Sequence, residues 1–530
     1  MMEDNEPAAR VLHYSGPETY GKDPPVQQRI LSPASLSSQT LSPLSGGISP
    51  NDRAHAPEEV SGLPGPGVSG NLHGRSTGFQ PVRSQKTGKM PALFALGQAR
   101  CLSYLYSASQ TPVPPLDPDR QRRFAVEAVR RLRAAGFQAY WAGGCVRDRL
   151  LGRQPKDYDV ATDATPPQVR RVFRRRKTVA VGAAFGVITV LGPPGAGQIE
   201  VATFRRDDTY SDGRHPDRVV FSSPQEDALR RDFTINGLFY DPLDDRVLDL
   251  VGGEQDLTNG LIRAVGDSYQ RFAEDKLRLL RAVRFAASLG FALESRTEEA
   301  IRRMASEITV VSPERIGGEM QRMLVDRHRS RGIRLLLETG LASPVLPEFV
   351  PAGDEHQARL ERTLAVLDRL EEPSFPLALA AVLHAWVDSS GAIGVCRRWR
   401  LSNAQTDRVA WLVEHRATLR EARSVPWSTL QKVIVAEGIE DLLALEEAVV
   451  SAAGGDTGHV AWCRSLLQQP SEVLDPPPLL TGDDLLRHGV PAGPIYRTVL
   501  GEVRRAQLDG EIHSQEEALR LAAALVRRVV

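Results

Sequence analysis

The chain has 530 residues, roughly the length of three or four ordinary domains, and its 66 Lys and Arg residues balance 66 Asp and Glu residues. A neutral total does not exclude a nucleic-acid partner, because what matters is whether positive charge gathers on one face. The four cysteines form no C-x-x-C pair, which argues against a disulfide framework and a thiolate zinc site.

Residues 1 to 115 differ from the rest of the chain because they are rich in Pro, Ser and Gly and carry no sustained helical or strand period. We expect them to be disordered, or to precede a true start nearer Met90. The first residues are acidic, where a secretory signal would be basic, and no apolar run approaches the ~18 residues of a membrane helix. These features favour a cytoplasmic protein that does not enter a membrane.

Helices and strands alternate after Asp117. Hydrophobic spacing, glycines and caps predict helices and strands in the order helix 119–135, strand 138–142, helix 146–151, strand 156–161, helix 165–174, strand 187–191 and strand 198–204. After Phe239 the pattern is almost wholly helical, with breaks near prolines. The fold class is therefore α+β. We divide the chain into a small head with a mixed sheet (116–255), a helical neck (256–330), a helical body (331–440) and a helical tail (441–530).

Two carboxylates stand out on the strand predicted at 156–161. Asp157 and Asp159 are two residues apart, so on a strand both side chains point to one face. Adjacent carboxylates repel each other unless a cation lies between them, and Mg²⁺ prefers a few carboxylate oxygens together with substrate phosphates. Alone, such a pair is more often a solvent-facing strand edge.

A glycine pair lies between the first predicted strand and the next helix. Gly143 and Gly144 would let backbone N–H groups approach a phosphate closely, with Arg147 beside it. The simpler alternative is a tight turn with a surface arginine.

Four blocks in order resemble class II CCA-adding enzymes and bacterial poly(A) polymerases, a family of nucleotidyltransferases. They are Gly143-Gly144-Cys145-Val146-Arg147-Asp148 with Asp157-Tyr158-Asp159, then Leu229-Arg230-Arg231-Asp232-Phe233-Thr234-Ile235-Asn236-Gly237, then 274–284, and finally Ser312-Pro313-Glu314-Arg315-Ile316 through Glu319. Gly237 and Lys276 stand where the family usually has Ala and Pro. The resemblance covers about 116–350.

The resemblance implies roles for individual residues. Asp157 and Asp159 would bind two Mg²⁺ ions that activate the tRNA 3′-hydroxyl and stabilise the departing pyrophosphate. Nucleotide contacts would come from Gly144 and Arg147, and from Arg231 on phosphate with Asp232 on ribose, while Asn236 would hold that loop.

The block 274–284 resembles the helix that selects the base. Asp275 and Arg278 are three residues apart, so on one helix they could present an acceptor and a donor to the exocyclic amino group and ring of CTP or ATP. Arg281 and Arg284 would grip the triphosphate. An ordinary salt bridge between Asp275 and Arg278 would explain the spacing equally well.

The sequence also bears on which family member this is. The run 180–187 looks like the tRNA-directed members, and the intact loop 210–216 favours members that add A. The expected function is therefore addition of CCA, or of its terminal A, to tRNA from CTP and ATP. A poly(A) polymerase and a non-catalytic RNA-binding protein are the alternatives. The residues carry no signal for an oligomeric state.

Several further residues have two interpretations. Glu200 is a candidate third carboxylate, or a partner for an arginine of the 204–206 loop. His384 is followed by Ala385 and so lacks the carboxylate of a His-Asp metal site, which makes the body a degenerate relative of such domains. His384, 28 positions after His356, is expected to be buried or capped. The stretches 397–400 and 504–505 are candidate RNA contacts or solvated helix faces.

Overall fold

The computed structural model describes residues 115–207, 219–350 and 353–529. The N-terminal segment expected to be disordered therefore lies outside the described residues. So does the loop 210–216, on which the expectation of A addition partly depends.

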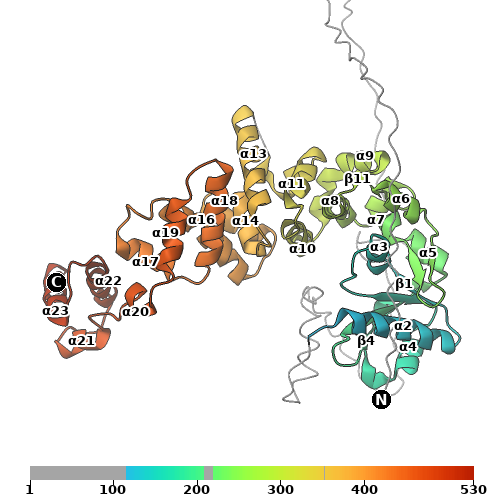
Figure 1. Cartoon of the computed structure of the whole chain (residues 1–530), viewed down its shortest axis with the longest axis horizontal. Helices are drawn as coiled ribbons and strands as arrows, with labels where there is room; N and C mark the ends of the chain where they lie inside the picture. Colours follow the sequence, from blue (N-terminus) through green and yellow to red (C-terminus); the bar gives the residue numbers. More distant parts are fainter. Residues whose placement is uncertain (1–114, 208–218, 351–352, 530) are drawn as a thin grey trace, which may run out of the picture. The chain divides into compact units, whose positions relative to one another are not determined.

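A seven-stranded mixed sheet forms the centre of the head (Figure 1). Strands β2 and β5 run parallel, and the other neighbouring pairs are antiparallel. In spatial order the strands are β3 (Thr178–Val179), β4 (Val187–Leu191), β5 (Gln198–Thr203), β2 (Asp159–Thr162), β1 (Ala139–Ala142), β8 (Phe239–Asp241) and β9 (Arg246–Leu248).

Alternating side chains give this sheet two different faces. Helices α2 (Pro118–Ala134) and α4 (Pro166–Phe173) pack on one face, where the core includes Val160. The opposite face carries a smaller cluster that includes Ala161 and Ala228 of α5 (Pro224–Leu229). Because successive strand residues point to opposite faces, Asp159 shares the face of Ala161, away from α2 and α4.

The elements predicted for the head are confirmed, with one correction. Thr165 and Gln168 form a capping box at α4, and the helix after the glycine pair is α3 (Gly144–Leu150). The strand predicted at 156–161 begins only at Asp159, so Asp157 lies in the bend before it. Strand β1 ends at Ala142, which is opposite Asp159 in the antiparallel register. Asp157 therefore has no residue of β1 to pair with.

Short elements missed by the sequence analysis complete the head and neck. Strands β6 (Arg205–Asp207) and β7 (Val219–Phe221) form one antiparallel pair, and β10 (Leu261–Ile262) and β11 (Ala292–Leu293) form one parallel pair. The 3-10 turns are η1 (Arg175–Lys177), η2 (Ala183–Phe185), η3 (Thr234–Asn236), η4 (Ala305–Val310) and η5 (Pro347–Phe349). The chain after Phe239 is thus helical apart from β8 to β11.

The neck is built around helix α8 (Leu277–Leu289), which packs against α10 and α11. The sequence predicts one helix from Glu274, and this is wrong: α7 ends at Glu274, and Asp275 is extended (φ −150°) before α8 begins. The helices of this region are α6 (Gly253–Asn259), α7 (Ser268–Glu274), α9 (Ser295–Met304), α10 (Pro313–Leu324), α11 (Arg329–Glu338) and α12 (Ala342–Val345).

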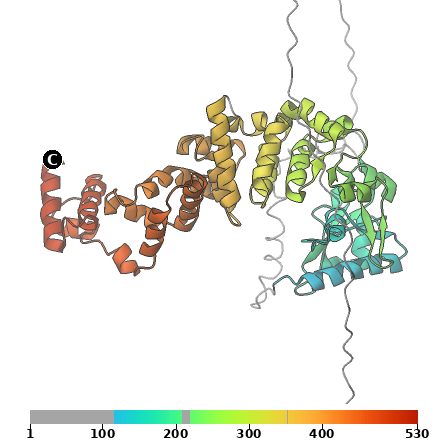
Figure 2. The same ribbon diagram turned by 45° about the horizontal axis from the view of Figure 1, so that its top comes forward.

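All regular secondary structure in the remaining described residues is helical (Figure 2). They form α13 (Asp354–Arg369), α14 (Phe375–Leu383), α15 (Ser389–Arg398), α16 (Asn403–Arg420), α17 (Trp427–Ile434), α18 (Ile439–Ala452), α19 (Gly458–Leu466), α20 (Ser471–Leu474), α21 (Gly482–Arg487), α22 (Ile495–Leu508) and α23 (Gln515–Val529). Residues from α21 to α23 have a small core of their own. Within the described ranges, no helix is both long and apolar enough to cross a membrane.

Candidate active site

A cleft of about 480 Å³ lies where the head meets α8. Eight of the ten residues predicted for the site line it; Asp157 and Arg284 do not. The lining comprises Gly143, Gly144, Arg147, Asp159, Arg230, Arg231, Asp232, Asn236, Asp275, Leu277, Arg278, Arg281, Phe285 and Arg315. Asp159 of β2 and the block 274–284 thus face one cavity, as the resemblance described above leads us to expect.

Three acidic residues lie close together at the head side of the cleft. Asp159 is paired in register with Glu200 on β5, so both side chains share a face, and Asp157 precedes Asp159. Desolvation raises the pKa of Asp159 to about 7, the charges of Asp157 and Glu200 add to this, and Arg231 opposes it. Desolvation and Asp157 also raise the pKa of Glu200. The acids therefore repel one another in the absence of a cation.

The alternative partners for Glu200 are engaged elsewhere. Arg206 forms an ion pair with Glu226, and Arg205 donates to the carbonyl of Phe185. The register with Asp159 therefore favours Glu200 as a neighbour of the acidic pair.

The acidic residues fit a divalent ion that shares its ligands with a substrate. Carboxylate oxygens are the ligands that Mg²⁺ prefers, and a cation would relieve the repulsion that raises the pKa of Asp159. Among the residues that the structure describes, no group of three or more His, Cys, Asp or Glu side chains could enclose a metal by itself. Such an ion would complete its shell with phosphate oxygens and water, as Mg²⁺ commonly does.

The glycine pair turns the chain at the floor of the cleft. Gly143 has φ +73°, and its N–H donates to the carbonyl of Leu238 at 3.0 Å. A Cβ at Gly143 would lie 2.8 Å from Nη1 of Arg231. The backbone conformation therefore requires glycine, and a Cβ there would also displace the flexible end of Arg231. Gly144 is different, because it is the first residue of α3 and has no positive φ.

These two glycines give a matched prediction. Gly143→Ala is expected to lower the free energy of unfolding by about 1–3 kcal/mol and to displace Arg231, since Ala rarely adopts this conformation. Gly144→Ala is expected to keep or slightly raise stability, because Ala favours a helix. Urea unfolding of both variants measures the difference. Equal stabilities would show that the turn does not need glycine at position 143.

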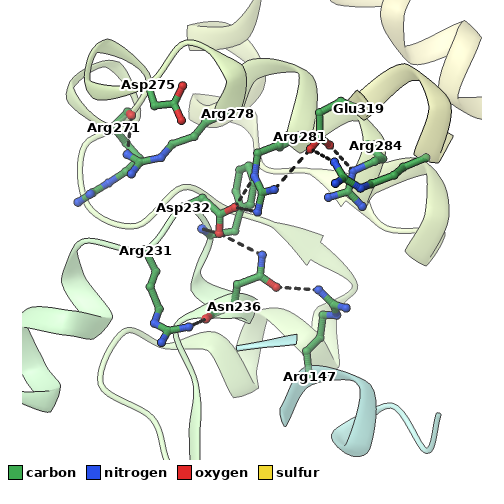
Figure 3. Close-up of polar contacts among 12 residues, drawn as sticks. Arg147, Arg231, Asp232, Asn236, Arg271, Asp275, Arg278, Arg281, Arg284 and Glu319 are labelled. Carbon is green, nitrogen blue, oxygen red and sulfur yellow. Dashed lines mark hydrogen bonds and ion pairs between the residues drawn. The ribbon is translucent and has the colours of Figure 1, made fainter. Parts of the chain in front are cut away.

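Asn236 connects three parts of the cleft (Figure 3). Its side-chain oxygen accepts from Nη1 of Arg147 at 2.8 Å, and its amide nitrogen donates to Asp232 at 3.0 Å. Its backbone carbonyl accepts from Arg231 at 3.1 Å. The sequence-based expectation that Asn236 holds this loop agrees with these contacts.

Asp227 is a buried residue that the sequence analysis missed. Its carboxylate is 2% exposed and accepts hydrogen bonds from both Arg230 and Arg231. Burial opposes its ionisation, but the charges of Arg231 and Arg230 and their hydrogen bonds keep its pKa low. Asp227 lies three residues before Arg230 and four before Arg231, and this spacing on a helix is the signal from which both pairs could have been predicted.

A chain of ion pairs runs from the cleft into the neck (Figure 3). Arg281 donates to Asp232 through Nε at 2.9 Å and Nη2 at 2.6 Å. Burial alone would raise the pKa of Asp232, but the charge of Arg281 and hydrogen bonds from Asn236 and Arg281 hold it well below the usual range. The 2% exposed carboxylate of Glu319 accepts from Arg284 at 2.5 Å and lies 3.6 Å from Arg281. Arg284 thus supports Arg281 from behind the lining.

Asp275 and Arg278 reach the cleft from different elements. Asp275 accepts two hydrogen bonds from the guanidinium of Arg315, at 3.1 and 2.6 Å. Arg278 pairs with Glu274 and donates to the carbonyl of Arg271 at 2.8 Å. Asp275 and Arg278 therefore form ion pairs with other residues that the structure describes, and not the salt bridge with each other that their spacing would explain. Arg315 lies in a block quoted from the sequence, but its role there was missed.

The two histidines of the body have ordinary structural surroundings. The Nδ1–H of His384 donates to the carbonyl of Ala381 at 2.8 Å, and burial lowers the pKa of His384 to about 4. His356 stacks on Trp386. His384 is half-buried at the C-terminal cap of α14, which agrees with the interpretation of a capped residue.

Comparison with known proteins agrees with this geometry. A family model described as the poly A polymerase head domain matches residues 139–263, and one described as the probable RNA and SrmB-binding site of polymerase A matches residues 290–352. A CCA-adding enzyme of Geobacillus stearothermophilus is 34% identical over 414 residues, 76% of this chain and 96% of that protein. One from Lactiplantibacillus plantarum is 34% identical over 400 residues, 74% of this chain and 93% of that protein.

Solved structures give the same picture. The crystal structure of the Bacillus stearothermophilus CCA-adding enzyme in complex with CTP is 30% identical, with a TM-score of 0.62, and the match covers 77% of this chain and 97% of that one. The Thermotoga maritima CCA-adding enzyme complexed with tRNA is 22% identical, with a TM-score of 0.52 over 76% of this chain and 95% of that one, and so supports the fold alone. The α+β head followed by a helical region is confirmed.

Proposed function

Because the chain belongs to the family of CCA-adding enzymes, we propose that it adds CCA, or its terminal A, to the 3′ end of tRNA from CTP and ATP and releases pyrophosphate. The observation that carries this proposal is the single cleft that Asp159, the glycine turn and α8 share. We place the reaction in the cytoplasm, in keeping with the free, buried Cys145, Cys396 and Cys463. The division into head, neck, body and tail at 255, 330 and 440 is part of the same proposal.

The charge of the cleft suits a triphosphate. Its lining contains six arginines and three aspartates, and Asp227 and Glu274 behind the lining hold Arg230, Arg231 and Arg278 in place. Arg147 and Arg231 are held by Asn236 near the glycine turn, where both guanidinium groups would meet phosphate oxygens. Fixed guanidinium groups bind phosphate strongly because little reorganisation is needed. Asp232, fixed by Asn236 and Arg281, would accept a hydrogen bond from the ribose.

The acidic pair would supply the metal site. Asp157 and Asp159, with Glu200 beside them, would hold Mg²⁺, which when bound lowers the pKa of the attacking 3′-hydroxyl and stabilises the departing pyrophosphate. The protein would position the RNA hydroxyl against the α-phosphate at this edge of the sheet, and the arginines would offset the charge that develops on the phosphates.

Base selection would come from Asp275 and Arg278 on the neck side of the cleft. Arg315 fixes the acceptor and Glu274 fixes the donor, so two independent ion pairs orient the edge that meets the base. Cytosine and adenine both carry an exocyclic amino group that can donate to Asp275, whereas uracil and guanine have a carbonyl there.

This assignment predicts the effect of Arg278→Ala. Loss of the donor is expected to raise the use of UTP and GTP relative to CTP by about tenfold or more, because discrimination of this kind depends on paired hydrogen bonds. The KM for tRNA should change by less than about twofold, so the effect separates base choice from RNA binding. Competition assays with mixed nucleotides measure it. Arg303→Ala on α9, where Arg303 is 68% exposed and pairs with Glu299, is the control. Unchanged selectivity in Arg278→Ala would rule out a role of Arg278 in base selection.

The function is tested with tRNA that lacks its terminal trinucleotide. Purified protein, Mg²⁺ and labelled CTP alone should add two nucleotides, and CTP with ATP should add three and stop. A protein that adds only the terminal A would extend tRNA ending in CC with ATP and leave the shorter tRNA unchanged. Long A tails on unrelated RNA would instead show a poly(A) polymerase, and RNA binding without incorporation would show a non-catalytic protein.

A further inference from the structure

One segment of the head departs strongly from the balanced charge of the chain. Between Asp163 and Glu200 there are six basic residues and no acidic one. We propose that these residues, the α4 basic run (Arg170, Arg171, Arg174, Arg175, Arg176 and Lys177), bind backbone phosphates of the RNA substrate outside the catalytic cleft. This inference rests on the proposed function and adds a second contact surface to it.

The run borders a groove that is separate from the cleft. A cavity of about 600 Å³ is lined by Pro166, Pro167, Arg170, Arg171, Arg174, Arg175 and Ala183, none of which lines the active-site cleft. Arg171 and Arg175 flank the end of α4, where Arg174 adopts φ +66° and turns the chain into η1. Four of the seven residues that line the groove are arginines, so its surface is strongly basic.

The positive charge of the run is available. Within the described residues, Arg171, Arg174 and Arg175 form no ion pair, and Arg170 contacts the hydroxyl of Thr178. The two stretches 397–400 and 504–505 differ, since Arg398 pairs with Glu348 and Arg400 with Glu314, and Arg504 and Arg505 also have acidic partners. Those stretches are therefore largely neutralised, whereas the α4 basic run is not.

The sheet register places the run near the reacting end of the RNA. Thr178, directly after η1, pairs with Val190, and Val190 pairs with Ile199. Ile199 precedes Glu200, which is paired with Asp159. The junction of η1 and β3 is therefore at the same end of the sheet as the acidic pair, three strands away, or about 14 Å at the usual strand spacing. Because α4 covers the opposite face, RNA leaving the cleft would pass around the strand ends to reach it.

The chemistry of the groove fits RNA backbone better than a free nucleotide. Its lining contains no aromatic side chain on which a base could stack. Arginine forks bind phosphate oxygens in pairs, and helical RNA is recognised largely through its shape and phosphates. We expect contacts that do not depend on sequence.

The test is the double variant Arg171→Gln/Arg175→Gln, measured with tRNA lacking its terminal trinucleotide. Each neutralised phosphate contributes about 0.9 to the slope of log affinity against log salt, so the slope should become shallower by about 1.8. Between 50 and 200 mM salt the wild-type protein should then lose about tenfold more affinity than the variant. The kcat with CTP at saturating tRNA and the KM for CTP should not change.

The matched control is Arg130→Gln/Arg131→Gln on α2, which removes two arginines that are 60% and 50% exposed and pair with Glu127. An equal change of slope in this control would overturn the proposal, as would an unchanged slope in the α4 variant. A raised KM for CTP with unchanged RNA affinity would also overturn it, because the run would then serve the nucleotide. Direct RNA binding measures the slope even if the protein adds no nucleotide, so this test and that of the function can fail separately.

Discussion

Replacing Asp159 by Asn is expected to lower the rate of CTP incorporation into tRNA by at least about 10³-fold. The cation would lose a carboxylate ligand and so would stabilise the charge of the transition state less well. The free energy of unfolding should not fall. Asn has nearly the same shape, and it removes a charge that desolvation and the charges of Asp157 and Glu200 already make unfavourable. Single-turnover incorporation and urea unfolding give the two values.

A loss of rate with retained stability is the distinguishing result for Asp159. Glu127→Gln, on the surface of α2 in the same head, removes a carboxylate that only pairs with Arg130 and Arg131 and should leave the rate unchanged. If Asp159→Asn incorporated CTP at the wild-type rate, the assignment of Asp159 as a metal ligand would be wrong.

Glu319→Ala is expected to have the largest effect on stability, a loss of about 3–5 kcal/mol in the free energy of unfolding. Glu319 is 2% exposed and is the carboxylate shared by Arg284, Arg281 and Arg322. Its removal leaves the guanidinium group of Arg284 enclosed by protein without its partner, and desolvation of an unpaired charge is costly. Thermal or urea unfolding of the variant measures the loss.

A surface ion pair is the comparison for Glu319. Glu298→Ala breaks an i,i+4 pair with Arg302 on α9, where Arg302 is 56% exposed, and should cost less than about 1 kcal/mol. If both variants lost the same small amount, Glu319 would be an ordinary surface acid and Arg281 would not depend on it. Retained stability with reduced activity would instead show that Glu319 positions Arg281 without stabilising the fold.

Local patterns were sufficient to predict most of the head. The caps and hydrophobic spacing of α2 and α4 and the alternation in β4 and β5 are properties of neighbouring residues, and the structure agrees with them. Patterns of neighbouring residues could not predict that Asp157 lies before β2 and outside the strand. The position of Asp157 depends on where β1 ends, and that is set by the turn at Gly143, far from Asp157 in sequence.

The site shows the same division between local and distant information. Asp159, Gly144, Arg147 and the arginines of 274–284 were identified because each lies in a recognisable block. The break at Asp275 was missed because a helical spacing of three continues across it. The pairing of Asp275 with Arg315 joins residues 40 positions apart, and Glu319 meets Arg284 across 35 positions. The periodicity of a single segment cannot predict partners that lie so far apart in the sequence.

The most direct test of the account is a crystal structure with CTP and Mn²⁺, in which anomalous scattering locates the ion. We predict a peak within coordination distance of the carboxylates of Asp157 and Asp159, with the triphosphate lying beside Gly144 and Arg147. An ion bound elsewhere, or a triphosphate outside the cleft between the head and α8, would contradict the proposed active site.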